Sequence, residues 1–320
     1  MALIRRGIAP NARNRHNPPA QYAYATVPHL TGLDMQSFAH IRPRKLTEAY
    51  AKTLLPVPRL PDSHKGDYGS VGILGGADGM VGAALLAGRA ALHMGAGRVY
   101  AGLLAHNHAP AVDVQQPELM LRPPHDLFKL ELSVMVAGPG LGISSEAYFW
   151  LCQALESSLP LVLDADALNL IAYFPQLQKN LAERKAPSLL TPHPGEAARL
   201  LGCSASAVQK SRNAAALQLA QNHNSAVVLK GANSVCATPE GDCFINTSGN
   251  PGLASAGTGD VLAGMMGALI AQGLTAQNAL VLAVYLHGRA ADELVQQGVG
   301  AAGLTASELP DAARRLFNNR

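Results

Sequence analysis

A glycine-rich stretch, Asn246-Thr-Ser-Gly-Asn-Pro-Gly-Leu-Ala-Ser-Ala-Gly-Thr-Gly-Asp260, leads directly into a run of apolar and small residues at 261–270. Apolar side chains recur in this run at steps of three and four residues, which predicts a buried helix over 260–272. Glycines can bring bare backbone N–H groups close to an anion, and the N-terminus of a helix attracts negative charge. The stretch therefore predicts a phosphate-binding site that contains the carboxylate of Asp260.

A carboxylate repels a phosphate, so a carboxylate in a phosphate-binding site is expected to have a function there. A base that takes a proton from an attacking hydroxyl group is one such function for Asp260. Aspartate is also a common N-cap residue, and in that case the glycines only form a turn. The residue types of this stretch leave both interpretations open.

Strands and helices alternate along the rest of the chain, which predicts an α/β fold built from βαβ units. The pattern predicts strands at residues 71–74, 99–103, 134–137, 161–163, 188–190 and 226–229, a hairpin at 235–237 and 243–245, and final helices at 260–272, 276–297 and 306–317. Thr305 and Glu308 fit a capping box for the last helix. Polar and glycine-rich segments follow the predicted strands, and the carboxyl ends of parallel strands are where open α/β sheets bind ligands.

The composition supports this fold class and excludes others. Of the 320 residues, 48% are hydrophobic but only 5% aromatic, which suits helices packed closely on a parallel sheet. Residues 1–60 hold nine of the 25 Lys and Arg residues and two of the 22 Asp and Glu residues, so the remainder carries 16 basic against 20 acidic side chains. This balance does not indicate a nucleic-acid surface.

Residues 1–60 differ from the rest by their basic charge and their prolines, and we interpret them as an irregular leader that precedes a folded body at 61–320. A targeting segment and a true start at Met35 are alternatives. The four cysteines show no CxxC motif or regular spacing, so neither a disulfide framework nor a zinc site is expected. With no secretory signal or membrane-length apolar run, we expect a cytoplasmic protein without a membrane partner.

Common nucleotide and hydrolase motifs do not fit these glycine-rich segments. The chain has no Gly-Lys dipeptide for a Walker A loop, and the Gly-x-Gly segments at 95–97, 138–140 and 257–259 lack the third glycine of a dinucleotide fingerprint. A nucleophile elbow around Ser255 fails because position 253 is leucine. The remaining chemistry is that of a kinase, in which a base activates a small hydroxyl group and helix N–H groups hold the phosphoryl charge.

Seven segments together resemble the NAD(P)H-hydrate dehydratase family of the ribokinase-like superfamily. They are Lys65-Gly-Asp-Tyr-Gly, Gly82-Ala-Ala, Gly138-Pro-Gly-Leu-Gly142, Leu163-Asp-Ala-Asp-Ala-Leu-Asn169, Leu190-Thr-Pro-His-Pro-Gly-Glu196, Asn250-Pro-Gly-Leu-Ala-Ser-Ala-Gly-Thr-Gly-Asp260 and His287-Gly-Arg-Ala-Ala-Asp292. The resemblance implies a mostly parallel central sheet with helices on both faces. It implies that the S epimer of hydrated NADH or NADPH is phosphorylated on its extra hydroxyl and then loses phosphate, which repairs the cofactor.

In this resemblance Asp260 is the base. The substrate is expected at Ala83, Gly140, His193 and Asp260. The nucleotide is expected at Lys230, Gly231, Ala232, Asn233 and Ser234, and at Asn250, Gly252, Ser255, Ala256, Gly257, Thr258 and Gly259. Magnesium is the implied metal, held through water by Glu196.

Several of these residues have simpler explanations. Ala83 can serve helix packing, Gly140 a tight turn, and Glu196 the first turn of a helix, where the dipole favours an acid. Prolines on both sides place His193 on an irregular loop, so a role in the core is not expected. Asp164 and Asp166 can approach magnesium or cap the helix that follows them.

The form Thr191-Pro-His-Pro-Gly-Glu196 resembles bacterial members, which implies ADP as the phosphate donor and AMP and phosphate as products, with ATP as the alternative. The leader is too short and too polar for the epimerase domain of many bacterial members, so we expect a separate epimerase as functional partner. The family also implies a homotetramer. Two other classes stay open: a small-molecule kinase of the hydroxyethylthiazole kinase type, and a nucleotide-binding module without turnover, which Asp260 argues against.

Overall fold

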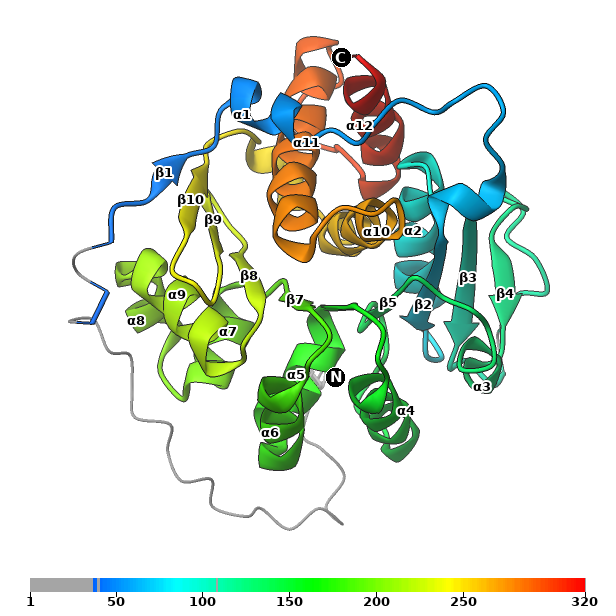
Figure 1. Cartoon of the computed structure of the whole chain (residues 1–320), viewed down its shortest axis with the longest axis horizontal. Coiled ribbons are helices and arrows are strands. Elements are labelled where there is room, and N and C mark those ends of the chain that lie inside the picture. The colour runs from blue at the N-terminus through cyan, green and yellow to red at the C-terminus, as the bar shows by residue number, and fades with distance from the viewer. Residues whose placement is uncertain (1–36, 39–40, 108, 320) are drawn as a thin grey trace, which may run out of the picture.

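The computed structural model describes residues 37–38, 41–107 and 109–319. Within them, ten strands form one sheet in the order β1-β10-β9-β8-β7-β6-β5-β2-β3-β4 (Figure 1). Only β9 runs antiparallel to its neighbours. The strands are β1 (Arg44–Lys45), β2 (Ser70–Gly75), β3 (Arg98–Leu103), β4 (Met120–Arg122), β5 (Val134–Ala137), β6 (Leu161–Leu163), β7 (Ser188–Leu190), β8 (Ala226–Leu229), β9 (Ser234–Ala237) and β10 (Cys243–Asn246).

Helices cover both faces of the sheet, as predicted. One face carries α1 (Glu48–Thr53), α2 (Val81–His93), α10 (Thr258–Ala271), α11 (Ala276–Gln296) and α12 (Leu309–Asn318). The other carries α3 (Pro124–Leu127), α4 (Ser145–Glu156), α5 (Ala165–Tyr173), α6 (Pro175–Glu183), α7 (Pro194–Leu201), α8 (Ala205–Lys210) and α9 (Arg212–Asn222). Three short 3-10 helices, η1 (Lys65–Tyr68), η2 (Pro251–Leu253) and η3 (Ala306–Glu308), complete the described elements.

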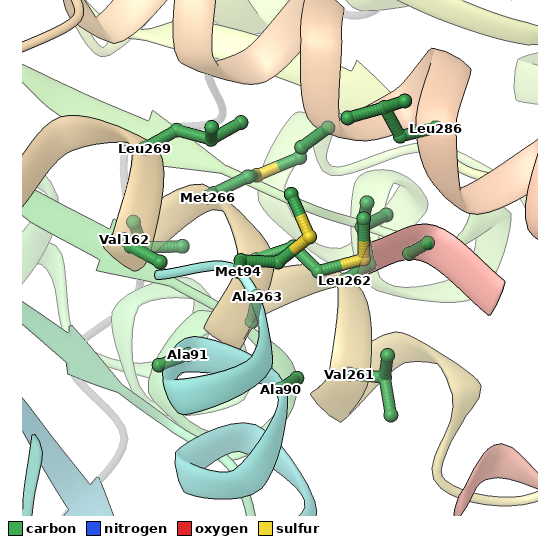
Figure 2. Close-up of a cluster of buried hydrophobic side chains, with 14 of the residues drawn as sticks. Ala90, Ala91, Met94, Val162, Val261, Leu262, Ala263, Met266, Leu269 and Leu286 are labelled. Carbon is green, nitrogen blue, oxygen red and sulfur yellow. The ribbon is translucent and has the colours of Figure 1, made fainter. Parts of the chain in front are cut away.

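Alternation along the strands divides the buried side chains into two cores. In β5, Val134 and Val136 point to the α10 face, while Met135 and Ala137 point to the α5 face. Both faces of a parallel sheet are thus buried, which explains why these strands read as continuous apolar runs in the sequence. Figure 2 shows part of the first core, where Met266 and Leu269 of α10 lie with side chains from α2 and α11.

Helix α10 is fixed closely against α2. A Cβ atom on Gly264 would lie 2.0 Å from the carbonyl oxygen of Ala87, so only glycine permits this approach. Alanines such as Ala90, Ala91 and Ala263 fill the rest of the contact (Figure 2). Small residues therefore determine where the N-terminus of α10 lies relative to the sheet.

The chain reverses direction across the sheet beside β2. It extends the sheet through β3 and β4 and then returns to place β5 on the other side of β2. Loops from the carboxyl ends of β2 and β5 therefore diverge here, and such a switch point is where open α/β sheets bind ligands.

The predicted boundary between leader and folded body needs correction. β1 pairs with β10, and Leu46 and Ala51 are buried in the core on the α10 face of the sheet. β1, Leu46 and Ala51 all lie before residue 61, so ordered elements begin before the predicted boundary. A two-residue strand and a six-residue helix are too short to show a periodic pattern. The predictions for residues 1–36 fall outside the described residues.

Two smaller points concern the described residues. The capping box of Thr305 and Glu308 is confirmed. No helix among residues 37–38, 41–107 and 109–319 combines the length and hydropathy that crossing a membrane requires.

Candidate active site

A cavity of about 700 Å³ opens at the carboxyl ends of β7, β8 and the start of α10. Its walls come from four segments that are distant in sequence: the His193 loop, residues 230–234, the loop after β10, and the inner face of α11. The lining is His193, Pro194, Lys230, Gly231, Ala232, Asn233, Ser234, Asn246, Thr247, Ser248, Gly249, Asn250, Pro251, Leu253, Ala254, Thr258, Gly259, Leu262, Val284, His287 and Gly288. A space of this volume is large enough for a nucleotide.

The first turn of α10 borders this cavity, and the start of a helix leaves backbone N–H groups without intrahelical partners. Gly257 is the N-cap residue, with φ of 88°, a left-handed conformation that a side chain rarely adopts. The hydroxyl of Thr258 donates to the carbonyl oxygens of Leu253 (2.9 Å) and Ser255 (3.1 Å), which ties the glycine-rich loop to the helix. Asp260 is therefore not the N-cap residue, and the simpler interpretation of the sequence does not hold.

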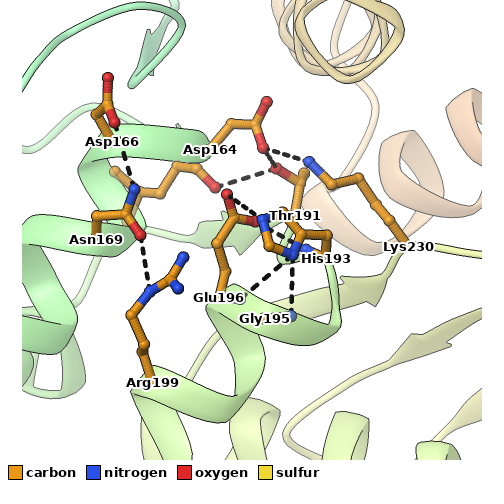
Figure 3. A network of polar contacts seen from close by, with 10 residues as sticks. Asp164, Asp166, Asn169, Thr191, His193, Gly195, Glu196, Arg199 and Lys230 are labelled. Atoms are coloured by element: carbon orange, nitrogen blue, oxygen red, sulfur yellow. Dashed lines mark hydrogen bonds and ion pairs between the residues drawn. The ribbon is translucent and has the colours of Figure 1, made fainter. Parts of the chain in front are cut away.

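A partly buried ion pair between Lys230 and Asp164, drawn in Figure 3, lies close to Gly259 at the start of α10. Lys230 Nζ donates to Asp164 Oδ1 at 2.7 Å, and Thr191 Oγ1 donates to the same oxygen at 2.6 Å. The side chain of Asp164 is 1% exposed and that of Lys230 is 21% exposed. A Cβ atom on Gly259 would lie 3.1 Å from Lys230 Nζ, so the absence of a side chain lets the ammonium group approach the helix end.

The pKa of Asp260 is raised by its surroundings. Burial and the neighbouring carboxylate of Asp164 raise the pKa of Asp260 to about 7, although Lys230 opposes the shift. Burial disfavours the charge of Lys230, but the carboxylates of Asp164 and Glu196 outweigh it and raise the pKa of the ammonium group. A carboxylate with a pKa near neutrality, held beside a fixed cation, is suited to accept a proton at physiological pH.

His193 and Glu196 form the start of α7. His193 Nδ1 accepts from the backbone N–H of Gly195 (2.9 Å), and Glu196 Oε2 accepts from the backbone N–H of His193 (2.8 Å). Burial and the nearby Lys230 lower the pKa of His193, whereas burial raises the pKa of Glu196 to about 7. The first-turn role of Glu196 is thus present in the structure.

Two predicted substrate residues lie together at the switch point of the sheet. A Cβ atom on Gly140 would lie 2.4 Å from the carbonyl oxygen of Met80 and 3.2 Å from the Cβ atom of Ala83. The φ of Gly140 is 59°, so the tight turn and the close approach to α2 both require glycine. Neither Gly140 nor Ala83 lines the large cavity.

Only some of the residues predicted to bind the nucleotide line the large cavity. Lys230 to Ser234, Asn250, Thr258 and Gly259 line the cavity, and so does His193, which the sequence assigned to the substrate. Gly252, Ser255, Ala256 and Gly257 do not line it. The Ser255 hydroxyl donates instead to the carbonyl oxygens of Gly252 (2.9 Å) and Leu304 (2.8 Å), a structural use.

Asp164 does not cap α5 through its side chain, because its carboxylate is used by Lys230 and Thr191. Asp166 accepts from the backbone N–H of Gly142 at 2.8 Å and thereby holds the loop after β5. Its other carboxylate oxygen accepts from Asn169 Nδ2 at 3.3 Å (Figure 3). Sequence reasoning gave Thr191 no role of its own, although it stands in a segment that was singled out. Only the pairing of β6 with β7 shows that Thr191 and Asp164 are neighbours.

The described residues contain no group of three or more His, Cys, Asp or Glu side chains placed to hold a metal ion directly. The carboxylates of Asp164 and Asp166 nevertheless lie close enough to Asp260 to raise its pKa, and those of Asp164, Glu196 and Asp260 act on Lys230. Carboxylate oxygens suit Mg²⁺, which binds through one or two carboxylates, waters and substrate phosphates.

A family model for NAD(P)H-hydrate dehydratases matches residues 71–315. The chain belongs to this family. It is 42% identical over 263 residues to the ADP-dependent (S)-NAD(P)H-hydrate dehydratase of Neisseria meningitidis, covering 81% of this chain and 88% of that protein. A bifunctional NAD(P)H-hydrate repair enzyme of Coxiella burnetii is 41% identical, covering 83% of this chain, but the chain spans only 53% of its length.

Solved structures agree with the family and confirm the ribokinase-like fold. The ADP/ATP-dependent NAD(P)H-hydrate dehydratase of Bacillus subtilis, co-crystallised with ATP and Mg²⁺, is 34% identical with a TM-score of 0.77, covering 87% of this chain and 98% of that one. A ribokinase-like superfamily protein of Enterococcus faecalis is 27% identical with a TM-score of 0.72, covering 86% and 95%.

Proposed function

We propose that this member of the NAD(P)H-hydrate dehydratase family returns the S epimer of hydrated NADH or NADPH to NAD(P)H at the expense of ADP. The observation that carries the proposal is the position of Asp260 in the first turn of α10, next to a cavity of about 700 Å³. Its carboxylate lies near Lys230 and has a pKa of about 7. The family relatives named as ADP-dependent dehydratases support it.

The chemistry follows from the leaving groups. Hydroxide leaves a carbon atom poorly, whereas phosphate leaves well. Asp260 would take the proton of the ring hydroxyl while the hydroxyl oxygen attacks the β-phosphorus of ADP. The bond from that phosphorus to the bridging oxygen would break, and AMP would leave with the bridging oxygen. The C–O bond of the phosphorylated ring carbon would then break to release phosphate, the neighbouring carbon would lose a proton to water, and the electron pair of that C–H bond would form the C=C double bond.

The remaining residues would bind and orient the reactants. The backbone N–H groups at Gly257 to Gly259 would hold phosphoryl oxygens, and Lys230 would supply positive charge beside them. Ala83 and Gly140 would receive the reduced ring at the switch point, and His193, which lines the cavity, would also contact the substrate. Mg²⁺, held by the surrounding carboxylates through water, would neutralise phosphate charge.

ADP is the proposed donor, although the B. subtilis relative carries both nucleotides in its name. The test is recovery of the absorbance of the reduced nicotinamide ring when hydrated NADH and Mg²⁺ are mixed with the protein and either ADP or ATP. Recovery with ADP would support reaction and donor together. A stable phosphorylated product without recovery of absorbance would instead favour a small-molecule kinase.

Three further expectations belong to this proposal. A separate epimerase would supply the S epimer, and the purified protein should not interconvert the two epimers. The protein would act in the cytoplasm. It would assemble as a homotetramer, which sedimentation at several protein concentrations would test.

A further inference from the structure

The segment His287-Gly-Arg-Ala-Ala-Asp292 belongs to α11 and has no role in the proposed chemistry. Two of its residues, His287 and Gly288, line the large cavity, but Asp292 does not. Asp292 instead contacts the loop that follows β10, from which Gly249 and Asn250 line the cavity. Helix α11 therefore forms part of the cavity wall, and Asp292 supports the adjoining loop without lining the cavity.

The contact uses both carboxylate oxygens of Asp292. Oδ2 accepts from the backbone N–H of Gly249 at 2.9 Å, and Oδ1 accepts from Asn250 Nδ2 at 3.2 Å. The other end of the Asn250 side chain accepts from the backbone N–H of Gly252 at 3.0 Å. Asp292 thus fixes the orientation of the Asn250 amide and, through it, the start of η2.

Further contacts join the same loop to α11 one to two turns earlier. Asn246 Nδ2 donates to the carbonyl oxygen of Val284 at 3.2 Å, and Ser248 Oγ is 3.3 Å from that of Tyr285. A Cβ atom on Gly288 would lie 2.3 Å from Ser248 Oγ, so glycine is needed for the loop to approach. The same face carries His287, whose Nε2 donates to the carbonyl oxygen of Thr258 at 2.9 Å in the first turn of α10.

We propose that Asp292 is a positioning residue for the nucleotide: it holds the loop at 246–250 in its binding conformation without touching the ligand. A loop that becomes ordered only when the ligand binds loses conformational entropy, which makes the binding free energy less favourable. A loop that is already fixed in the free protein avoids this loss. Asp292 supplies two acceptors to two donors of the loop, which an uncharged side chain of the same shape cannot do. This inference rests on the proposed nucleotide cavity.

The test is the Kd of ADP with Mg²⁺, measured by calorimetry on the full chain for the wild type, Asp292→Asn, Asn250→Asp and the double variant. Asp292→Asn leaves one loop donor facing an NH₂ group, and Asn250→Asp places two carboxylates together. Each should raise the Kd by about ten-fold or more. In the double variant the amide and the carboxylate exchange places, every donor again meets an acceptor, and most of the affinity should return.

Glu293→Gln is the matched control, because it removes the same charge one residue later, where Glu293 faces Arg315 of α12. It should leave the Kd unchanged. Melting temperatures of all variants separate a lost loop contact from a damaged fold, since a general loss of structure would not be rescued by the exchange.

Unchanged affinity in Asp292→Asn, or a double variant as weak as the sum of the single ones, would overturn the inference. Failure of the wild type to bind ADP or ATP would overturn the proposed cavity itself. Binding by the wild type without recovery of the reduced ring would contradict the proposed reaction and leave the role of Asp292 intact.

Discussion

The two sides of the cleft are built from different materials. The nucleotide side consists mainly of backbone groups and small side chains, from Gly231 to Ser234, from Ser248 to Ala254, and at Thr258 and Gly259, supported by α11. The catalytic side consists of ionisable groups around Lys230, with pKa values near 7 for Asp260 and Glu196. Fixed N–H dipoles can bind an anion without changing protonation, whereas proton transfer needs a group whose pKa lies near the working pH. Changes on the two sides should therefore have separable effects on binding and turnover.

The sharpest test of this contrast is Asp260→Asn. The amide keeps the size of the carboxylate but cannot accept the proton, so turnover should fall by about 10³-fold, within the range for a general base. Binding of ADP should be retained, measured by calorimetry beside a turnover assay. Retained turnover would remove Asp260 from its role, and a parallel loss of binding would show that the two sides are not separable.

Lys230→Met should disturb the catalytic side in two ways. It leaves the carboxylate of Asp164, 1% exposed, without its cation, which should lower the free energy of unfolding by about 3 kcal/mol or more. It also removes the charge that lowers the pKa of Asp260, so the acidic limb of the pH–rate profile should move to higher pH. Urea unfolding and a pH–rate profile measure these effects, and an unmoved profile would contradict the coupling.

Two separate buried histidines should make the folded protein less stable at acid pH, which limits the pH range in which binding and turnover can be compared. Burial lowers the pKa values of His223 and His287 to about 4, from an ordinary value of 6.5. Both are neutral above pH 6.5 in either state; as the pH falls from 6.5 to 4 the unfolded chain binds protons first, so stability is lost in that window. A drop from 6.5 to about 4 corresponds to about 3 kcal/mol for each histidine.

His223→Leu should abolish its part of this acid loss. Neither ring nitrogen of His223 has a hydrogen-bond partner among the described residues, so the substitution removes no hydrogen bond. Urea unfolding at pH 7 and pH 5 should show a smaller difference for the variant than for the wild type. An equal difference in both proteins would show that His223 is not responsible.

The smallest expected effect is that of Ser234→Ala on the nucleotide side. The Ser234 hydroxyl donates to the carbonyl oxygen of Gly231 at 3.0 Å and thereby closes the turn after β8. Loss of this exposed hydrogen bond should weaken nucleotide binding by about 1 kcal/mol or less, without changing kcat. A fall in kcat at unchanged KM for ADP would show that Ser234 acts in turnover and not in nucleotide binding, which would contradict the division into two sides.

Most elements could be predicted from sequence where a short apolar run ends at a glycine or a polar residue. The strands β5, β6, β7 and β8 lie at their predicted residues, and the last helices differ by a few residues at their ends. The leader boundary failed because β1 and α1 are short and contact β10 and α11, which lie about 200 residues or more later in the chain. Local propensity carries no signal for such long-range contacts.

The glycine-rich turn before Asp260, the helix behind it and the family could be read from the amino-acid sequence, because these depend on local conformation and on motif order. That Thr191 and Lys230 share the carboxylate of Asp164 becomes visible only in the folded protein, since these residues follow three different strands that the sheet places side by side. The same holds for the contact of Asp292 with Gly249, because a helix of the final third of the chain packs along a loop from before α10. Hydrogen bonds between distant segments exist only once the sheet has aligned them.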